Sequence, residues 1–316
     1  MNVATPPPRL AQRVNDKIWF AQRLREVISA DAVPLTYSIF SPSALAARLR
    51  SLTDRYAQVA IKVPDSAGSV GNIMVRAEHL SQRSLKGISQ HIQNILIGRG
   101  WEKRYPLLVG VWEHPVLDSP SVNFWIPRTE LGDPVLECVF SQILTGPVGE
   151  FSGATPSRLA SALLQQLTYE ATCLAKYLQF LGYFGRCSFD SIIIGQSPET
   201  ATIHWIECNG RWGGVSIPIT VANKILVDWR GASPIIIQNT NMTLSPIRLS
   251  KAMSALKNHL LRPPEHLTCV IFLSPQNLLD GTGLNAMILE DTDDKADAVL
   301  TSMKHLLSPK NQTKYC

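Results

Sequence analysis

The chain has 316 residues, of which 45% are hydrophobic and 17% are charged, so it can bury a large core as two domains or as one domain with subdomains. Its formal net charge of +5 gives little support for a nucleic-acid partner and suits a site for phosphate or carboxylate groups. No stretch approaches the roughly 18 consecutive apolar residues of a membrane-spanning helix, and the proline-rich start lacks the apolar segment of a secretion signal. We therefore expect neither a membrane nor a nucleic acid as partner.

The cysteines are scattered, mostly in or beside apolar runs, and none has the CxxC spacing of a zinc site. This pattern is typical of buried, reduced thiols and predicts a cytoplasmic protein without a disulfide framework. The cysteines are Cys138, Cys173, Cys187, Cys208, Cys269 and Cys316.

The chain begins with a helix that carries a lysine. Apolar residues at helical spacing predict an amphipathic helix over residues 9–28, broken near Asn15 and Asp16. Lys17 follows this break, and a solvated helix face is the alternative to a binding role for it. The next expected elements are a strand over 33–40 and a helix that starts with Ser41 as its N-cap and a proline in its first turn and continues over 44–52.

Residues 58–75 are predicted to form a strand, a glycine-bearing turn and a second strand. A lysine at the end of a buried strand is costly unless it meets an anion, which makes Lys62 a candidate phosphate ligand. The small residues Gly68, Ser69 and Gly71 allow backbone N–H groups to close over phosphates. This is not a Walker A loop, because the lysine precedes the glycines. A β-hairpin with a polar tip is the alternative.

A buried strand later in the chain leads into polar residues. The apolar run from Pro106 ends at Trp112 and Glu113, so it can join two lobes and offer backbone hydrogen-bonding groups to an adenine edge. The other expected elements here are a helix over 79–98 with a core-facing stripe (Leu80, Leu85, Ile88, Ile92 and Ile95), antiparallel strands over 121–127 and 134–140, a mobile glycine loop over 146–153 and a helix over 156–181.

Three polar residues alternate at the end of an apolar strand. Glu207, Asn209 and Arg211 are spaced two apart, so in an extended strand they project from one face. Ile206 and Cys208 would then face the core. A hard cation such as Mg²⁺ takes oxygen ligands from a carboxylate and an amide, and an arginine beside it suits phosphate or carboxylate. The alternative is an edge strand with a solvated polar face.

The preceding strand brings a second carboxylate to the same place. A β-branched strand after Gly182 and the strand of Glu207, joined by a turn over 196–200, predict a β-hairpin that sets Asp190 beside Glu207. Adjacent carboxylates repel each other and destabilise the pairing unless a cation lies between them. The sequence therefore favours a site in which Asp190, Glu207 and Asn209 hold one or two Mg²⁺ ions.

The last third of the chain carries structural signals only. The acidic cluster over 290–294 is interpreted as the cap of the final helix rather than as a metal site. No paired histidines and no Gly-x-Ser-x-Gly motif occur in the sequence, so nucleophilic hydrolysis lacks support. The expected elements are a strand over 234–237, a helix near 250–261, a strand over 268–273 and a helix over about 293–307.

In this order the motifs resemble the ATP-grasp superfamily over roughly residues 10–225. No motif is specific alone, and the resemblance rests on five in the right order. They are Asn15-Asp16-Lys17, Ala60-Ile61-Lys62-Val63-Pro64 with the glycine turn, the strand that ends at Glu113, Gly182-Tyr183-x-Gly185 followed by Asp190, and Glu207-x-Asn209-x-Arg211. The second and the last are similar in style to those of the pheganomycin-type peptide ligases.

The resemblance implies an α+β fold of the ATP-grasp type, in which two α+β lobes with antiparallel sheets grip ATP. The lobes would span residues 1–111 and 112–225, and residues 226–316 would form a C-terminal α/β extension. The resemblance also implies an ATP- and Mg²⁺-dependent ligase that activates a carboxylate as an acylphosphate and joins it to an amine, releasing ADP and phosphate. A non-catalytic ATP-binding interaction module and an ATP-grasp kinase are the alternatives.

Roles for single residues follow from the resemblance as well. Two lysines and the small-residue loop would bind the phosphates of ATP, the hinge would hold adenine and ribose, and an arginine would steady the transferring phosphoryl group. The implied cofactor-binding residues are Lys17, Lys62, Gly68, Ser69, Gly71, Trp112 and Glu113. The implied metal ligands are Asp190, Glu207 and Asn209, and the implied catalytic residues are Arg211 and Lys62.

Members of the superfamily usually carry a preceding α/β domain that helps to bind the carboxylate substrate, and only a short segment precedes Asn15 here. We expect an upstream domain, a partner protein or residues 226–316 to supply that role. The expected substrates are a small-molecule or peptide carboxylate and an amine.

Overall fold

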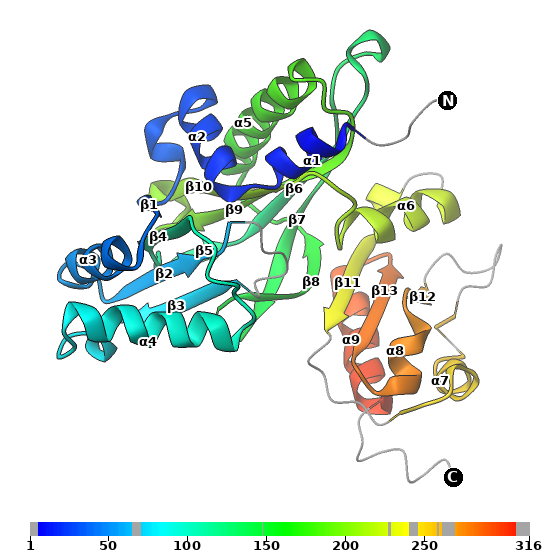
Figure 1. The fold of residues 1–316 in the computed structure, drawn as a ribbon. Helices are drawn as coiled ribbons and strands as arrows, with labels where there is room; N and C mark the ends of the chain where they lie inside the picture. Colours follow the sequence, from blue (N-terminus) through cyan, green and yellow to red (C-terminus); the bar gives the residue numbers. More distant parts are fainter. Residues whose placement is uncertain are drawn as a thin grey trace. The chain divides into compact units, whose positions relative to one another are not determined.

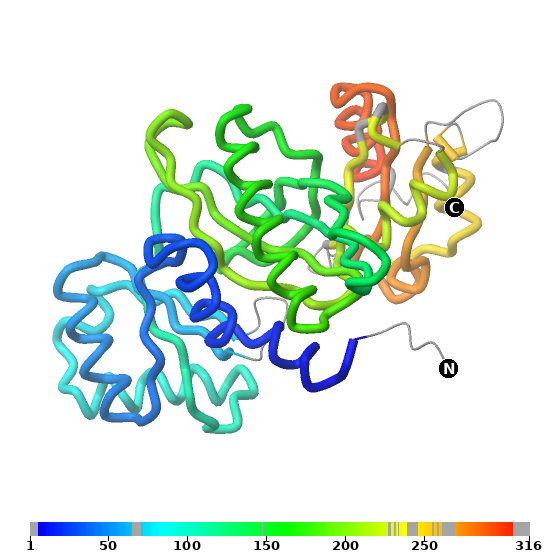
Figure 2. Tube along the Cα trace, turned by 90° about the horizontal axis from the view of Figure 1, so that it is seen from above, coloured from blue at the N-terminus to red at the C-terminus, as the bar shows by residue number. Residues whose placement is uncertain are grey.

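The computed structural model describes residues 6–64, 71–146, 148–226, 229–239, 246–257, 259–260 and 269–307. The chain divides into two compact units, and Figures 1 and 2 colour it from its N-terminus to its C-terminus. The first unit comprises Met1–Cys138, Thr145–Glu150 and Leu159–Arg211, and the second comprises Val139–Leu144, Phe151–Arg158 and Trp212–Cys316. Strand β7 (Val135–Thr145) therefore begins in the first unit and continues in the second.

Two helices open the first unit, and they meet at the predicted break. Helix α1 (Pro8–Val14) stops just before the break and α2 (Lys17–Val27) starts just after it. Asp16 caps α2, because its Oδ1 accepts hydrogen bonds at 2.8 and 2.9 Å from the amides of the second and third residues of this helix. The prediction of a broken helix is confirmed, and the cap places Lys17 in the first turn of α2.

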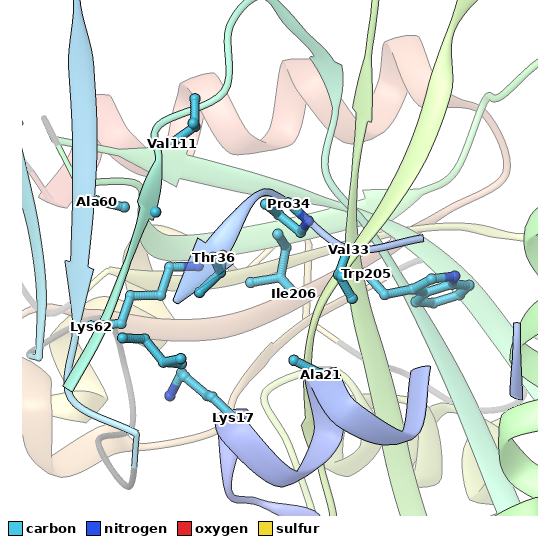
Figure 3. Close-up of a pocket in the computed structure, with 12 residues that line it drawn as sticks. Lys17, Ala21, Val33, Pro34, Thr36, Ala60, Lys62, Val111, Trp205 and Ile206 are labelled. Carbon is cyan, nitrogen blue, oxygen red and sulfur yellow. The ribbon is translucent and has the colours of Figure 1, made fainter. Parts of the chain in front are cut away.

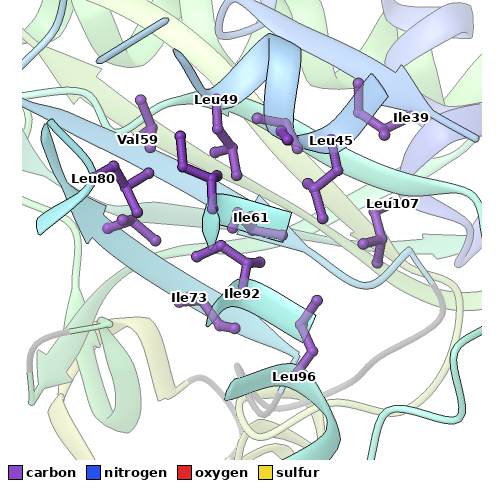
Figure 4. Close-up of a cluster of buried hydrophobic side chains, with 14 of the residues drawn as sticks. Ile39, Leu45, Leu49, Val59, Ile61, Ile73, Leu80, Ile92, Leu96 and Leu107 are labelled. Carbon is purple, nitrogen blue, oxygen red and sulfur yellow. The ribbon is translucent and has the colours of Figure 1, made fainter. Parts of the chain in front are cut away.

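The smaller sheet of the first unit is antiparallel and consists of β1 (Thr36–Ile39), β4 (Leu107–Val111), β2 (Gln58–Lys62) and β3 (Asn72–Arg76), in this order. Helices α3 (Pro42–Thr53) and α4 (Leu85–Gly98) pack against each other and against this sheet, because apolar residues recur along each at helical spacing. Figure 4 shows the buried cluster between them, in which Leu49 of α3, Ile92 of α4 and Ile61 of β2 take part.

Helix α4 begins later than the sequence predicted. Ser84 ends the preceding turn and caps the helix, since its Oγ accepts a hydrogen bond at 3.2 Å from the amide three residues on. Before it, residues 77–79 form a separate 3-10 helix, η2 (Ala77–His79). Leu85 is 51% exposed, so its place in the predicted core-facing stripe is wrong, whereas Ile88 and Ile92 are buried as predicted.

The larger sheet of the first unit contains β10 (Thr202–Asn209), β9 (Gly185–Ile194), β6 (Pro120–Ile126) and β7 side by side, and β5 (Val116–Asp118) also pairs with β9. Strands β9 and β10 form the predicted β-hairpin, with the 3-10 helix η4 (Pro198–Thr200) in its turn. Helix α5 (Ser161–Phe180) packs on β6, and the rings of Phe20 in α2 and Phe189 in β9 stack with centroids 6.0 Å apart.

The predicted mobile loop over 146–153 is wrong in its second half, because strand β8 (Glu150–Pro156) occupies that part. Gly153 lies within β8 and pairs with β11 (Ser233–Asn239). A Cβ at this glycine would overlap the carbonyl oxygen of Ile236 in β11, so the glycine serves close strand pairing rather than mobility. Because β8 runs to Pro156, helix α5 starts later than predicted. Pro147 lies outside the described residues.

The second unit extends β7 and β8 into a sheet with β11, β13 (Leu284–Glu290) and β12 (Cys269–Phe272), in this order. Its helices are α6 (Ser216–Ile225), α7 (Leu249–Ala255), α8 (Pro275–Asp280) and α9 (Asp293–Leu307). Apolar residues of β11, β12, β13, α7, α8 and α9 share one buried cluster, which includes Ile288 and Met303. The remaining 3-10 helices of the chain are η1 (Ala30–Ala32), η3 (Thr129–Leu131) and η5 (Trp229–Gly231).

Most of the elements predicted for this unit are confirmed. The strands expected over 234–237 and 268–273 correspond to β11 and β12, and the final helix corresponds to α9. Helix α7 is shorter than the expected helix near 250–261, and strand β13, which lies between β11 and β12, was not predicted. Glu290, assigned to the helix cap with its acidic neighbours, is the last residue of β13 and is buried.

The structure also bears on the predictions made for the cysteines and for membrane-spanning helices. The cysteines among the described residues are free thiols, as predicted: Cys138, Cys187, Cys208 and Cys269 are buried, and Cys173 is half-buried. Within the ranges that the structure describes, no helix has the length and apolarity needed to cross a membrane.

The core of the smaller sheet gives a test of the packing. Ile92 of α4 is fully buried, whereas Ile97 on the same helix is 40% exposed. We expect Ile92→Ala to lower the free energy of unfolding by about 2–5 kcal/mol, because it leaves a cavity among Leu49, Ile61 and their neighbours. The matched control Ile97→Ala should change it by less than about 1 kcal/mol. Urea denaturation followed by circular dichroism measures both, and equal losses would contradict this packing.

Candidate active site

Strand β10 carries a β-bulge just before the predicted metal ligands. Its register against β9 shifts between Trp205 and Glu207, so Ile206 is an extra residue. Trp205 is the residue that enters the core: it is 1% exposed, and its Nε1 donates a hydrogen bond to the Glu170 carboxylate at 2.8 Å. Ile206 is half-buried and lines a pocket, so the prediction that it faces the core is wrong, while Cys208 does face the core.

The bulge sets two carboxylates side by side, as the sequence predicted. Asp190 of β9 lies directly opposite Glu207. Ser121 Oγ donates a hydrogen bond to Asp190 Oδ1 at 2.7 Å, and Asn209 Nδ2 donates to Asp190 Oδ2 at 2.9 Å. The same amide nitrogen lies 3.5 Å from Glu207 Oε1. Burial, and then the negative charge of Glu207, raise the pKa of Asp190 to about 7.

Lys17 brings positive charge to this pair. Its Nζ lies 3.1 Å from Oε2 of Glu207, and the residue is 5% exposed. A buried ammonium group is tolerated only when a partner compensates its charge, and Glu207 does so here. The alternative of a solvated helix face for Lys17 is therefore excluded.

A backbone contact holds α2 against the end of β10. The amide of Gly210 donates a hydrogen bond to Asn15 Oδ1 at 3.0 Å, and Asn15 Nδ2 donates to the carbonyl of Ala11 at 2.6 Å. A Cβ at Gly210 would overlap Cγ2 of Val14 and lie 3.3 Å from the ring of Tyr183. Only glycine permits this approach, which fixes the first turn of α2 beside the carboxylates.

Lys62 ends strand β2, as predicted, and shares the electrostatic environment of the carboxylate pair. Burial lowers the pKa of Lys62, the negative charge of Glu207 raises it in part, and the positive charge of Lys17 lowers it again. A smaller raising effect comes from Glu113. The three groups Lys17, Lys62 and Glu207 are therefore electrostatically coupled, although they come from α2, β2 and β10.

Both lysines line one pocket, shown in Figure 3, with about 450 Å³ of space that is partly open to solvent. Lys17 and Lys62 extend into it from α2 and β2, and Ile206 lies between the walls, whereas the Trp205 ring points away. Small and apolar residues form most of the rest of the wall: Ala21, Val33, Pro34, Thr36, Ala60, Leu108, Gly110 and Val111. The lining is largely apolar and has a cationic end, a combination that is common in small-molecule sites.

Gly110 keeps part of this pocket open. It pairs with Thr36 between β4 and β1, and a Cβ at Gly110 would lie 2.5 Å from the carbonyl oxygen of Leu35 and 2.7 Å from Thr36 Oγ1. The glycine thus allows β1 to approach β4 closely, and it adds no side chain to the pocket wall that it lines.

Arg211 contacts the carboxylate pair through Asn209. Its guanidinium nitrogen donates a hydrogen bond to Asn209 Oδ1 at 2.7 Å, so the amide turns its oxygen to Arg211 and its nitrogen to the carboxylates. These ligand atoms suit a hard cation, since two carboxylates lie side by side and burial, followed by the charge of Glu207, raises the pKa of Asp190. Among the described residues no three His, Cys, Asp or Glu side chains form a metal-binding group, so the amide oxygen of Asn209 would have to complete the set.

The predicted hinge lies where β4 ends. Trp112 is half-buried, and its amide donates to the carbonyl of Gln58 at 3.2 Å. Glu113 Oε2 lies 2.5 Å from Nδ1 of His204, and both side chains are mostly buried, at 14% and 17% exposed. His204 is on β10, two residues before Ile206, so it faces the same side of the strand.

Three residues of the site were missed by the sequence analysis. Ser121 sits on an alternating strand, and its position opposite Asp190 depends on strand order, which the sequence pattern does not supply. His204 was hidden by the bulge, because plain alternation from Glu207 puts it on the opposite face. Gly210 follows Asn209 directly, and its closeness to Asn15 is a contact between distant parts of the chain that only the fold reveals.

The small-residue loop is described only at its end. Gly68 and Ser69 lie outside the described residues, whereas Gly71 is buried and its carbonyl accepts a hydrogen bond from the amide of Val63 at 3.1 Å. This bond closes the base of the turn between β2 and β3, beside Lys62.

Comparison with known proteins identifies the fold. No protein-family model and no curated protein sequence matches the chain. Among solved structures it is similar to N5-carboxyaminoimidazole ribonucleotide synthetase from Thermus thermophilus, at 13% identity and a TM-score of 0.64, over 96% of this chain and 75% of that one. The Aspergillus clavatus N5-carboxyaminoimidazole synthase is similar at 13% identity and a TM-score of 0.62, over 96% and 76%.

A third similar structure is the biotin carboxylase domain of Hydrogenobacter thermophilus 2-oxoglutarate carboxylase, at 13% identity and a TM-score of 0.62, over 96% of this chain and 68% of that one. These similarities show that the chain has the ATP-grasp fold, with mixed helices and antiparallel sheets, as the sequence predicted.

The contact between Gly210 and α1 can be tested. We expect Gly210→Ala to lower the free energy of unfolding by about 1–3 kcal/mol, because the new methyl group overlaps Val14. Val14→Ala in the same chain should relieve the overlap, so the double variant loses less stability than the sum of the single variants. Gly213→Ala is the matched control, since a Cβ there meets nothing within 4 Å. Thermal denaturation measures all four, and a harmless Gly210→Ala would contradict the contact.

Proposed function

We propose that the protein is an ATP- and Mg²⁺-dependent ligase that activates a carboxylate as an acylphosphate and joins it to an amine. One observation carries the proposal: a largely apolar pocket ends at two lysines that face a carboxylate pair. A nucleoside triphosphate has a flat, largely apolar base at one end and a chain of anionic phosphates at the other, and this pocket is complementary to both. The fold supports the same function, because similar structures were solved with ADP, ATP and MgADP.

In the proposed reaction, an oxygen of the acceptor carboxylate attacks the γ-phosphorus of ATP. The bond from the γ-phosphorus to the bridging oxygen breaks, and ADP leaves the acylphosphate. The amine nitrogen then attacks the acyl carbon, phosphate leaves, and the nitrogen loses a proton as the amide forms. Lys17, Lys62 and Arg211 contribute positive charge where phosphoryl oxygens become more negative, which is the main work of a protein in such transfers.

Asp190, Glu207 and Asn209 would hold Mg²⁺, which when bound neutralises phosphate charge and aligns the phosphate chain. The Lys17 ammonium group would then contact both the Glu207 carboxylate and the phosphates, and its positive charge would let these anions lie close together. Gly68, Ser69 and Gly71 are proposed to cover the phosphates, and Trp112 with Glu113 to hold the nucleoside. The proposal also includes the substrate specificity of the pheganomycin-type peptide ligases, domain boundaries at residues 111 and 225, and a cytoplasmic location.

A turnover assay tests the function. The protein is incubated with ATP, Mg²⁺ and a pool of amino acids, ADP and free phosphate are measured, and amides are sought by mass spectrometry. We expect Glu207→Gln to lower ADP release at least about 100-fold, because it removes charge from the metal and from Lys17. The matched control Glu199→Gln changes an exposed carboxylate on the turn of the same hairpin and should be neutral.

The outcomes of this assay separate the alternatives. Equal background release by the wild type and Glu207→Gln would contradict the ligase proposal. Phosphate found on a product, with none free, would identify a kinase. Tight ATP binding in calorimetry without turnover would identify a non-catalytic binding module.

Metal binding should depend on pH through Asp190. Because the pKa of Asp190 is raised to about 7, a proton occupies this carboxyl below pH 7 and competes with the cation. We therefore expect the affinity for Mg²⁺ to fall about fivefold from pH 7 to pH 6, and to change little above pH 8. Calorimetry in two buffers of different ionisation enthalpy should detect about one released proton at pH 6 and almost none at pH 8. Equal affinities at pH 6 and pH 8 would contradict this assignment.

A further inference from the structure

Close in sequence to residues that line the pocket lies a second polar pair, which the phosphate and metal roles do not use. Glu113 and His204 meet through Oε2 and Nδ1 at 2.5 Å, and both side chains are mostly withdrawn from solvent. They come from different elements: Glu113 lies two residues after Val111 of β4, and His204 lies two residues before Ile206 of β10, and both Val111 and Ile206 line the pocket. A mostly buried carboxylate held by one histidine contact keeps other lone pairs that can accept hydrogen bonds.

The backbone positions of this pair are displaced along the strands from those of Lys62 and Glu207, although the charge of Glu113 still acts on Lys62. In the pairing of β2 with β4, Lys62 is opposite Leu108, whereas Val59 at the other end of β2 is opposite Val111. Glu113 lies beyond Val111, and is therefore displaced along the strands from the Lys62 backbone. On β10, likewise, His204 comes three residues before Glu207, the partner of Lys17. Along β4 and β10, the apolar pocket residues Val111 and Ile206 therefore lie between the Glu113 and His204 pair and the positions beside the two lysines.

A nucleotide presents matching groups in the same order. Its phosphates are anions, its base is flat and apolar on its faces, and its ribose hydroxyls donate hydrogen bonds. Carboxylates are suitable acceptors for ribose hydroxyls, as in dinucleotide-binding folds. The carboxylate must be held in one orientation to select for a hydroxyl, because a freely rotating carboxylate accepts hydrogen bonds from water as readily as from the sugar.

We propose that His204 is the positioning residue that fixes the Glu113 carboxylate to accept hydrogen bonds from the ribose, so that His204 determines selection of ribonucleotides over deoxyribonucleotides. The inference rests on the proposed function, since it takes the pocket to bind a nucleotide. His204 acts through Glu113, and because 91 positions separate the two residues in sequence, the fold brings them together to form the sugar site.

Calorimetric binding of ADP and of 2′-deoxy- and 3′-deoxy-ADP, each with Mg²⁺, tests this role. We expect the wild type to bind ADP about tenfold more tightly than at least one deoxy analogue, since one hydrogen bond to a charged group is lost. His204→Phe, which keeps a ring but loses Nδ1, should reduce that ratio to about one. His204→Asn can place an N–H near the position of Nδ1. This variant should restore at least half of the preference for ADP, when the preference is expressed as the logarithm of the affinity ratio.

Binding of a second ligand distinguishes a positioning role of His204 from a general loss of structure in the variant. Inorganic tripolyphosphate reaches the lysines without a sugar, so its affinity should stay within about twofold in His204→Phe. An unchanged ratio of ADP to deoxy-ADP affinity in His204→Phe would overturn the inference and leave the proposed function standing. A wild type that binds ADP and both analogues equally would also overturn the inference alone. A wild type that binds no nucleotide would overturn the proposed function together with it.

Discussion

The repulsion between Asp190 and Glu207 is the constraint to which the rest of the site responds. Two adjacent strands place these carboxylates opposite each other in a partly buried setting, where their charges are poorly screened. The protein offsets the repulsion with several groups: the ammonium of Lys17, the hydroxyl of Ser121 and the amide of Asn209. These groups lower the cost of the pair without removing it: burial, and then the charge of Glu207, still raise the pKa of Asp190 to about 7. A bound cation would relieve what remains.

Bringing those groups together depends on two backbone features more than on side-chain chemistry. The bulge at Ile206 shifts the end of β10 by one residue, so that Ile206 and Glu207 are both available to the pocket while Trp205 stays in the core. The hydrogen bond from Gly210 to Asn15 then ties α2 to that strand end. Through it, Lys17 and Glu207 become neighbours although 190 positions separate them in sequence, and the ion pair need not hold the elements in place alone.

The sequence predicts what is local and periodic, and it misses what depends on tertiary contacts. The break at Asp16, the cap at Ser41 and the hairpin of Asp190 and Glu207 follow from short-range rules, and each is present. The resemblance to the ATP-grasp superfamily, built on ordered motifs, predicted the fold. The composition of the sequence gives no sign of the bulge, so the predicted face of Ile206 was wrong. Strand β13 was missed because its pairing partners β11 and β12 are separated from it in sequence or by a helix.

Asn209 connects the two halves of the proposed chemistry. In this structure its amide nitrogen faces Asp190 and its oxygen faces Arg211, so it serves both as a donor to the anions and as an acceptor for the guanidinium. A cation between the carboxylates takes oxygen, not nitrogen, as ligand. Turning the amide to offer its oxygen would present N–H groups to Arg211, which itself can only donate. The amide rotation that completes a cation site would therefore break the hydrogen bond from Arg211 to Asn209 Oδ1. The arginine would then favour a new anionic partner, such as a phosphoryl group.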